Sequence, residues 1–392
     1  MTISRHYILA AGGTGGHMMP AHALASELMA RGHHVALITD ARGAKIPGLF
    51  DGVQTHILPA GRITKNPLSW PKGVMAIRAG RAMALRLFET FKPSAVVGFG
   101  GYPAYPALIA AQSAGIPTAV HEQNAVLGRV NRLVAGRVSA IATAYPNISR
   151  LAESNKGKVH LVGNPVRSSV LALRDQGFPP IDGDGVFRLL VTGGSQGASI
   201  LGDVVPDALA LMPLAFRQRL QVTQQCRPED IDRVRASYAH HAIAADLSTY
   251  IEDMPEKLGW AHLVIARAGA STIAELTAAG RPAILIPLPS ATDDHQTHNV
   301  RELVAAGGAR AIAQANFTST ELAKQMQKLA LEPGALENAA ARAKGVGRPN
   351  ATSDLADLVE STGGAGLMDV IQVGAGSSAR SVRSSTLGAS AA

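Results

Sequence analysis

Short, continuous apolar runs recur along the chain, and stretches with helical spacing of apolar residues separate most of them. A continuous apolar strand is typical of a parallel sheet whose two faces are both covered by helices. We predict helices at 21–30, 73–91, 104–113 and 200–211, among others. We predict strands at 7–11, 35–39, 55–58, 95–99, 118–121, 139–143 and 159–162, and again at 188–192, 221–225, 242–245, 263–266, 283–287 and 310–313. The pattern therefore predicts an α/β fold with two doubly wound, Rossmann-like parallel sheets that face a cleft.

The repeating pattern is interrupted near Gly163-Asn164-Pro165, where proline restricts the backbone of its own and the preceding residue. We therefore predict a first domain over residues 1–164 and a second over 165–361, with the last helix returning to the first domain. Residues 362–392 are rich in Gly, Ala and Ser and carry few charges. Such a segment buries too little apolar surface to offset its ordering entropy, so we predict a disordered tail.

Composition narrows the class of protein. The single cysteine, Cys226, excludes an intramolecular disulfide framework and fits a reducing compartment. No apolar stretch approaches the roughly 20 residues of a membrane-spanning helix, and the short run at 7–11 is not a signal peptide. The net charge of +8 is uneven, because residues 1–165 carry +11 and the remainder −3. The basic first half favours an anionic partner such as a membrane, a charged substrate or nucleic acid.

Two glycine-rich loops of the same design follow the first predicted strand of each half. The first is Gly-Gly-Thr-Gly-Gly-His at 12–17, and the second is Gly-Gly-Ser-Gln-Gly at 193–197. A strand, a glycine turn and a helix N-terminus together form an anion site, because bare N–H groups and the positive end of the helix dipole converge there. Neither loop matches a Walker or a G-x-G-x-x-G motif. We predict two phosphorylated ligands; the alternative is two tight turns without a ligand.

The second half offers groups for a nucleotide sugar. Arg167 supplies a fixed charge with a bidentate fork, and residues 266–272 form a third turn between a strand and a helix. We place Glu275 in the first turn of that helix, where it would accept both ribose hydroxyls; the alternative is favourable placement in the helix dipole. The polar run 293–299 suits sugar hydroxyls, or else simply caps a helix. Metal-ligand motifs are lacking around His295, so we expect no metal site.

The first half offers groups for an acceptor. His17 begins the helix after the first loop, where a neutral imidazole would take a proton from a hydroxyl. The alternative is a structural histidine that bonds the backbone. Asn124, at the end of a predicted strand, would hold an acceptor group, and Glu122 would orient an imidazole. The glycine turn at 98–102 follows another strand and is expected at the same cleft.

Residues 62–92 carry seven Lys or Arg and one acid, Glu89, interleaved with Trp70 and aliphatic side chains. A basic amphipathic segment with a tryptophan is typical of a membrane-surface element. The alternative is an ordinary packed helix with a solvated basic face. Nucleic acid is disfavoured, because aromatic residues are few and no reader motif is present.

These segments resemble the MurG family, the bacterial N-acetylglucosaminyltransferases that make lipid II. The resemblance runs from about residue 5 to 361 and rests on the motifs at 12–21, 96–106, 121–132, 162–167, 192–198, 250–254, 266–275 and 293–299. It implies a GT-B fold and an inverting transfer from UDP-N-acetylglucosamine to the MurNAc 4-hydroxyl of lipid I, without an obligatory metal or other cofactor. It also implies peripheral attachment to the cytoplasmic face of the inner membrane, with cell-wall and division proteins as partners. The tail after 361 falls outside the family pattern, and Met18-Met19 replace the hydrophobic-aromatic pair of that loop.

The resemblance also assigns residues to two sites. Residues 1–164 would bind lipid I and the membrane. Residues 165–361 would bind the donor, UDP-N-acetylglucosamine. His17 would be the catalytic base or would bind the acceptor pyrophosphate. The implied donor site comprises Thr14, Gly15, Gly16, Asn124, Arg167, Gly194, Ser195, Gln196, Ile251, Ala270, Ser271, Thr272, Glu275, Gln296 and Asn299. The implied acceptor site comprises Gly13, Thr14, Gly16, His17, Tyr102 and Asn124.

Other functions stay open on the sequence. A GT-B enzyme acting on another lipid, such as a diacylglycerol galactosyltransferase, would share most of these features. A UDP-N-acetylglucosamine 2-epimerase would share the architecture without needing the basic segment. A non-catalytic nucleotide-sugar sensor or membrane scaffold would bind without turnover. A dehydrogenase is disfavoured despite Asp40 at the end of the second strand, because neither loop has the required spacing.

Overall fold

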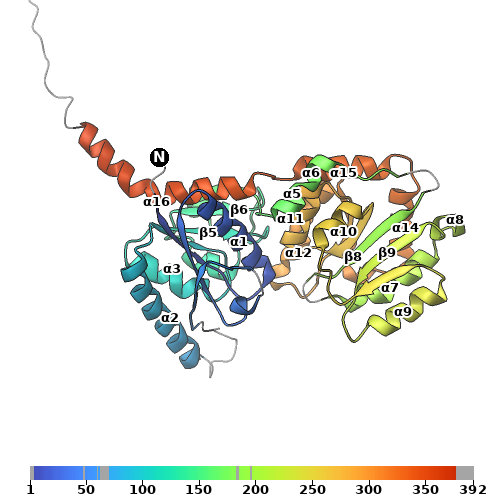
Figure 1. Ribbon diagram of the computed structural model, residues 1–392, viewed down its shortest axis with the longest axis horizontal. Helices are drawn as coiled ribbons and strands as arrows, with labels where there is room; N and C mark the ends of the chain where they lie inside the picture. Colours follow the sequence, from blue (N-terminus) through green and yellow to red (C-terminus); the bar gives the residue numbers. More distant parts are fainter. Residues whose placement is uncertain are drawn as a thin grey trace, which may run out of the picture.

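The computed structural model describes residues 4–46, 49–59, 61, 70–181, 185–194 and 197–376, with the backbone alone for 365–376. Two sheets, side by side in Figure 1, contain only parallel pairings. The first has the order β3-β2-β1-β4-β5-β6-β7 and the second the order β10-β9-β8-β11-β12-β13. The predicted fold class is confirmed.

The first sheet is formed by short strands with helices between them. Its strands are β1 (His6–Ala10), β2 (His34–Thr39), β3 (Gln54–Ile57), β4 (Ala95–Gly98), β5 (Thr118–Glu122), β6 (Ala140–Thr143) and β7 (Val159–Leu161). Its helices are α1 (Gly15–Ala30), α2 (Trp70–Phe91), α3 (Ala104–Ser113) and α4 (Arg129–Val134), with 3-10 turns at Gly43–Lys45 and Glu153–Lys158. Alternate residues of β1 enter different cores: Leu9 packs with α1, and Ile8 packs with α3.

The second sheet repeats this plan. Its strands are β8 (Phe187–Thr192), β9 (Leu220–Gln225), β10 (Ala245–Ser248), β11 (Leu263–Arg267), β12 (Ala283–Ile286) and β13 (Ala309–Ala311). Its helices are α5 (Ser168–Leu171), α6 (Leu173–Gln176), α7 (Ser199–Ala210), α8 (Leu214–Arg217), α9 (Ile231–His240), α10 (Met254–Trp260), α11 (Ala270–Ala279), α12 (His295–Asn299), α13 (Arg301–Ala306), α14 (Ser319–Ala330) and α15 (Ala335–Val346), with 3-10 turns at Thr292–Asp294 and Gln314–Asn316. The last helix, α16 (Ala351–Gly376), packs on the first sheet.

Strand order fixes where ligands can bind. In each sheet the connections reverse direction at one point, between β1 and β4 in the first and between β8 and β11 in the second. Crevices open beyond the carboxyl ends of strands at such points. The first glycine loop follows β1, and the second follows β8. Both loops therefore occupy the favoured binding position of their own sheet.

The predicted strand at 242–245 is wrong in position, because β10 covers Ala245–Ser248. The apolar run that suggested it belongs to the turn after α9. Ala242 has a φ of 53°, and Ile243 is buried beneath that turn. The strand itself is polar because it lies at the edge of the sheet.

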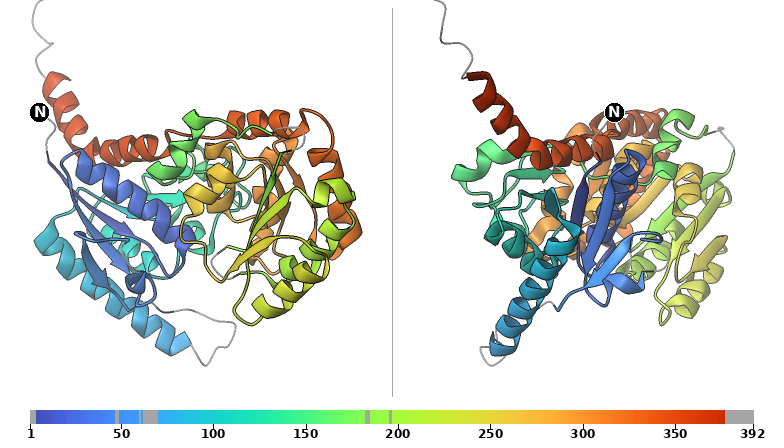
Figure 2. Two further views of the ribbon diagram at one scale, coloured as in Figure 1. Left: turned by 45° about the vertical axis from the view of Figure 1, so that its right-hand side comes forward. Right: turned by 60° about the vertical axis from the view of Figure 1, so that its left-hand side comes forward.

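The predicted disordered tail also begins too early. Helix α16 continues through Gly376; both views in Figure 2 show its first part beside the first domain and its end projecting away from it. Leu355 and Val359 enter the core around β1, and Arg31 of α1 binds Glu360 at 2.9 Å. Thr362 is buried, and Gly363 lies close to Tyr7. Small residues after 361 therefore allow close packing and continue the helix; residues 377–392 lie outside the described part.

Candidate active site

Helix α1 starts directly after the first glycine loop, at Gly15, and not at the predicted Ala21. Pro20 lies inside the helix, in its second turn, without ending it. The amides of Gly15 and Gly16 are consequently the unpaired donors of the first turn, and no acidic residue occupies that turn. Thr14 immediately precedes the helix, in extended conformation. The loop has the geometry of an anion site.

His17 lies in the first turn of α1, and its imidazole is oriented by the loop. Its Nδ1 lies 3.1 Å from the carbonyl oxygen of Gly12 and 3.2 Å from the hydroxyl of Thr14. Since a carbonyl oxygen only accepts, Nδ1 carries the hydrogen and Nε2 keeps its lone pair. Nε2 faces the backbone of Gly100, in the turn that follows β4 and ends at Tyr102. Burial lowers the pKa of His17, partly offset by the bond to Gly12.

Glu122 has a different role from the predicted one. Its carboxylate accepts from the backbone N–H of Asn124 at 3.1 Å and of Gly128 at 2.7 Å, and from the amide of Asn131 at 2.9 Å. It contacts no imidazole in the described structure, so the predicted orienting role is wrong. Burial raises the pKa of Glu122, and these donors oppose that shift. The carboxylate fixes the turn that carries Asn124.

Asn124 meets Asn299 across the two domains. The Asn299 amide nitrogen donates to Asn124 Oδ1 at 3.1 Å and to the Ala268 carbonyl at 3.3 Å. Asn299 Oδ1 accepts from the backbone N–H of Ala125 at 2.8 Å. Asn299 is fully buried, so both ends of its amide are occupied by protein. These two predicted donor residues thus join the domains directly.

The second glycine loop is described on either side of its tip. Ser195 and Gln196, both predicted donor residues, lie outside the described part of the chain. Gly193 donates its N–H to Gln225 Oε1 at 3.2 Å, and Gly194 donates to the hydroxyl of Thr192 at 3.3 Å. Helix α7 starts at Ser199, one residue after the loop. The described start of the loop is therefore anchored to β8 and β9.

Arg167 and Glu275 form an ion pair at 2.8 Å. Glu275 lies in the second turn of α11, so its predicted position in the first turn is wrong. Burial raises the pKa of Glu275, and Arg167 opposes that shift. The bond uses Oε1 of the carboxylate. The remaining oxygen Oε2 is the one that can accept from ribose hydroxyls.

The start of α11 completes the donor side. Ala270, Ser271 and Thr272 form its first turn after the extended Gly269. The Ser271 hydroxyl is buried with no hydrogen-bond partner among the described atoms. Gln296 Oε1 accepts from the backbone N–H groups of Ala268 and Leu288 at 3.1 and 2.9 Å. Its amide nitrogen is thereby directed away from that loop. Ile251, whose backbone is predicted to bind the uracil of the donor, is buried beside α11.

An ion cluster near the same cleft joins the domains again. Asp293, at a φ of 57°, binds Arg132 at 2.8 Å and Arg150 at 3.0 Å. Next to it, His298 Nδ1 lies 3.2 Å from the hydroxyl of Ser149. The segment 293–299 therefore contacts the first domain at both ends, and Gln296 joins it to the loop before α11.

Comparisons with known proteins agree with this arrangement. Residues 7–143 match the glycosyltransferase family 28 N-terminal domain, and residues 188–359 match its C-terminal domain. A UDP-N-acetylglucosamine–N-acetylmuramyl-(pentapeptide) pyrophosphoryl-undecaprenol N-acetylglucosamine transferase of Erythrobacter litoralis is 66% identical over 96% of this chain and 94% of its own. The transferase of the same name from Novosphingobium aromaticivorans is 67% identical over 95% and 96%. The crystal structure of Acinetobacter baumannii MurG covers 91% of this chain and 99% of its own, with 29% identity and a TM-score of 0.74. The chain belongs to the MurG family of glycosyltransferases.

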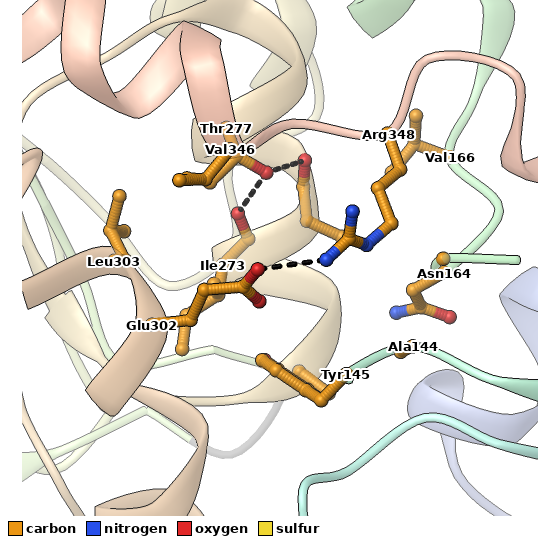
Figure 3. A pocket seen from close by; sticks show the side chains of 13 residues that line it. Ala144, Tyr145, Asn164, Val166, Ile273, Thr277, Glu302, Leu303, Val346 and Arg348 are labelled. Atoms are coloured by element: carbon orange, nitrogen blue, oxygen red, sulfur yellow. Dashed lines mark hydrogen bonds and ion pairs between the residues drawn. The ribbon is translucent and has the colours of Figure 1, made fainter. Parts of the chain in front are cut away.

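One feature of this MurG-family chain was not predicted. A cavity of about 40 Å³ lies where the chain crosses between the domains, and Figure 3 shows residues of both crossings around it. Arg348 binds Glu302 there at 2.7 Å. Asn164 is only 6% exposed, and both polar atoms of its side chain lack a described partner. A polar cavity of this size holds a few water molecules, which would satisfy the amide.

The structure describes the basic segment 62–92 from Trp70 onward, and residues 62–69 lie outside the described part. On α2, large apolar side chains are exposed, with Met75 at 69% and Trp70 at 49%. Lys72, Arg78 and Arg81 belong to the same helix. No helix among the described residues is long and apolar enough to cross a bilayer.

The predicted absence of a metal site concerned the cluster around His295. In the structure Asp293 binds two arginines, and His295 Nδ1 bonds the Thr292 carbonyl at 2.8 Å. Within the described ranges, no group of three or more His, Cys, Asp or Glu side chains is arranged to hold a metal ion.

Proposed function

We propose that this chain transfers N-acetylglucosamine from UDP-N-acetylglucosamine to the MurNAc 4-hydroxyl of undecaprenyl-pyrophosphoryl-MurNAc-pentapeptide, giving lipid II for peptidoglycan synthesis. The observation that carries the proposal is the near full-length similarity to transferases named for this reaction. It is supported by two glycine loops at the switch points of two sheets, one for each phosphorylated substrate.

The donor would lie against the second domain. Its diphosphate would bind Gly194, Ser195 and Gln196 together with the first turn of α11, Ala270 to Thr272. Arg167 would add a fixed positive charge, and Glu275 Oε2 would accept from the ribose. The backbone near Ile251 would bind uracil, and the amide nitrogen of Gln296 would donate to the sugar. Asn299 would position this site from the domain interface.

The acceptor would lie against the first domain. Its pyrophosphate would bind the amides of the first loop, from Gly13 to Gly16, and its sugar would lie near Tyr102 and Asn124. Thr14, Gly15 and Gly16 also face the cleft in which the transferred sugar must sit.

His17 would act as the general base. The acceptor oxygen forms a bond to the anomeric carbon as that carbon's bond to UDP breaks, and the hydroxyl proton passes to His17 Nε2. A single displacement inverts the anomeric configuration. The charge on the departing UDP is stabilised by helix N–H groups and Arg167. These groups supply the stabilisation that a metal ion provides elsewhere, so the proposal includes no obligatory metal.

The enzyme would act at the cytoplasmic face of the inner membrane, attached peripherally through the basic segment 62–92. Anionic lipids attract clustered Lys and Arg, and the exposed Trp70 and Met75 would enter the interface. Cell-wall synthesis and division proteins are the proposed protein partners.

The test is a transfer assay with purified protein, radiolabelled UDP-N-acetylglucosamine and a short-chain lipid I analogue, without added metal. The expected result is label on the analogue with stoichiometric release of UDP. Tight UDP binding without transfer would favour a sensor, and conversion of the donor sugar without an acceptor would favour an epimerase. Either outcome would overturn the proposal.

A further inference from the structure

The first domain contains a groove that shares only Tyr102 with the assigned sites. Its volume is about 670 Å³, and it lies among the carboxyl ends of β2 and β3, helix α2 and Tyr102. The groove therefore begins beside the first glycine loop and extends toward α2.

The end near the loop is charged. The guanidinium of Arg42 packs on the loop so closely that a Cβ at Gly13, where φ is +56°, would lie 2.4 Å from Nη2. Asp40 Oδ2 accepts from Arg42 Nε at 3.2 Å and Nη2 at 2.9 Å, while its Oδ1 accepts from the Gly43 N–H at 2.8 Å. A guanidinium has five N–H groups, so three remain for an anion on the loop.

The rest of the groove is apolar. Ile57 of β3 is 51% exposed and Met83 of α2 is 42% exposed, and both line it together with Leu58 and Pro59. Large apolar side chains gathered at a surface indicate a binding site. A cation at one end and an apolar surface beyond it complement an amphiphile that has one anionic end.

We propose that this groove binds the first isoprene units of a polyprenyl diphosphate and that Arg42 binds its diphosphate beside the first loop. The assignment rests on the proposed function, whose acceptor is such a molecule. A lipid must run from its phosphates on the loop toward the bilayer, and α2 carries the exposed Trp70 and Met75. The groove leads from the loop to this helix, whereas a peptide stem would gain little from its apolar walls.

The test compares the binding of farnesyl diphosphate and inorganic diphosphate by titration calorimetry on the full chain. The wild type should bind farnesyl diphosphate at least about tenfold more tightly, because burial of its isoprene units removes apolar surface from water. The pair Ile57→Ser and Met83→Ser should remove that preference, and Arg42→Ala should weaken both ligands. Met29→Ser and Lys45→Ala, at exposed positions outside the groove, are the matched controls. Thermal melting of each variant checks folding.

Equal affinity of the wild type for both ligands would overturn the proposal, as would a preference that survives in the double serine variant. If that variant instead raises the KM only for acceptors that carry a pentapeptide, the groove binds the peptide and the lipid assignment is wrong. Binding is measured without turnover and transfer is assayed in parallel. A preference for farnesyl diphosphate without transfer activity would therefore support the proposed groove and contradict the proposed function.

Discussion

The two glycine loops share a design but differ in what surrounds them. The first runs directly into α1, with a titratable side chain, His17, in the first turn. The second ends one residue before α7 begins, and the second domain contributes the fixed charge of Arg167, which is paired with Glu275. A site that must move a proton needs a group with a tunable pKa, whereas a site that must hold a leaving diphosphate needs permanent charge. Under the proposed function, the same local fold would serve two different chemical tasks.

The strongest test of this comparison is His17→Ala. Loss of a general base should lower turnover about 10² to 10⁴-fold, while the affinity for UDP stays nearly constant because the donor binds the other loop. Steady-state kinetics and UDP titration measure the two effects separately. The variant His34→Ala, an exposed position on β2, is the control. A near-normal rate would exclude the base role.

A complementary change on the donor side is Arg167→Ala. Hydrogen bonds to charged groups contribute about 1.5–3 kcal/mol, so UDP affinity should fall roughly 10- to 100-fold. The variant also leaves the buried Glu275 without its partner, which is why Glu275→Gln should be combined with it. Because Glu275 is itself assigned to the ribose, the reference is the single variant Glu275→Gln. If the double variant folds but binds UDP more weakly than Glu275→Gln does, Arg167 binds the diphosphate directly. Unchanged affinity in the single variant would contradict this role.

The pH dependence of the transfer rate tests whether the first loop contributes a titratable base. Burial lowers the pKa of His17 below its ordinary value of 6.5, so the base is neutral above that pKa and protonated below it. The rate at saturating substrate should therefore be flat at neutral pH and should fall up to tenfold per pH unit on an acidic limb below 6.5. His121, whose pKa burial lowers to about 4, stays neutral over most of this range. A limb above pH 7 would contradict the assignment.

The smallest expected effect comes from the contacts that join the two sites. Asp293→Asn should weaken the bonds to Arg132 and Arg150 and change kcat by about two- to fivefold, since partly exposed ion pairs contribute about 0.2–1 kcal/mol. Small-angle scattering with and without UDP would report any change in domain closure. Asp232→Asn, on an exposed pair within α9, is the matched control. An equal effect of both substitutions would exclude a role for this interface.

The local pattern of apolar and polar residues was sufficient to predict most of the fold. Every predicted strand has a counterpart, because continuous apolar runs flanked by turns specify buried parallel strands. The error at β10 arose where this signal is weakest, since an edge strand is polar and the nearby apolar residues belong to a turn. Glycines after residue 361 suggested disorder, but their packing partners are distant in sequence.

The candidate sites were predictable only in part, because a local sequence pattern does not encode contacts between distant segments. Glycine loops and the positions of His17 and Arg167 follow from their own segments. The pairing of Asn124 with Asn299 and of Arg167 with Glu275 joins residues more than a hundred positions apart, which no local pattern encodes. The cavity beside Asn164 likewise needs both crossings of the chain.

Those two crossings touch each other. Gly163 lies against the second crossing so closely that a Cβ there would come within 2.7 Å of Arg348 Cβ. The two chain crossings therefore meet at one place, and Asp293 and Asn299 join the domains at others. If the domains move relative to one another, the meeting point of the crossings is where the backbone has to bend. The packing of a few atoms beside Asn164 would then act as a hinge for the whole molecule.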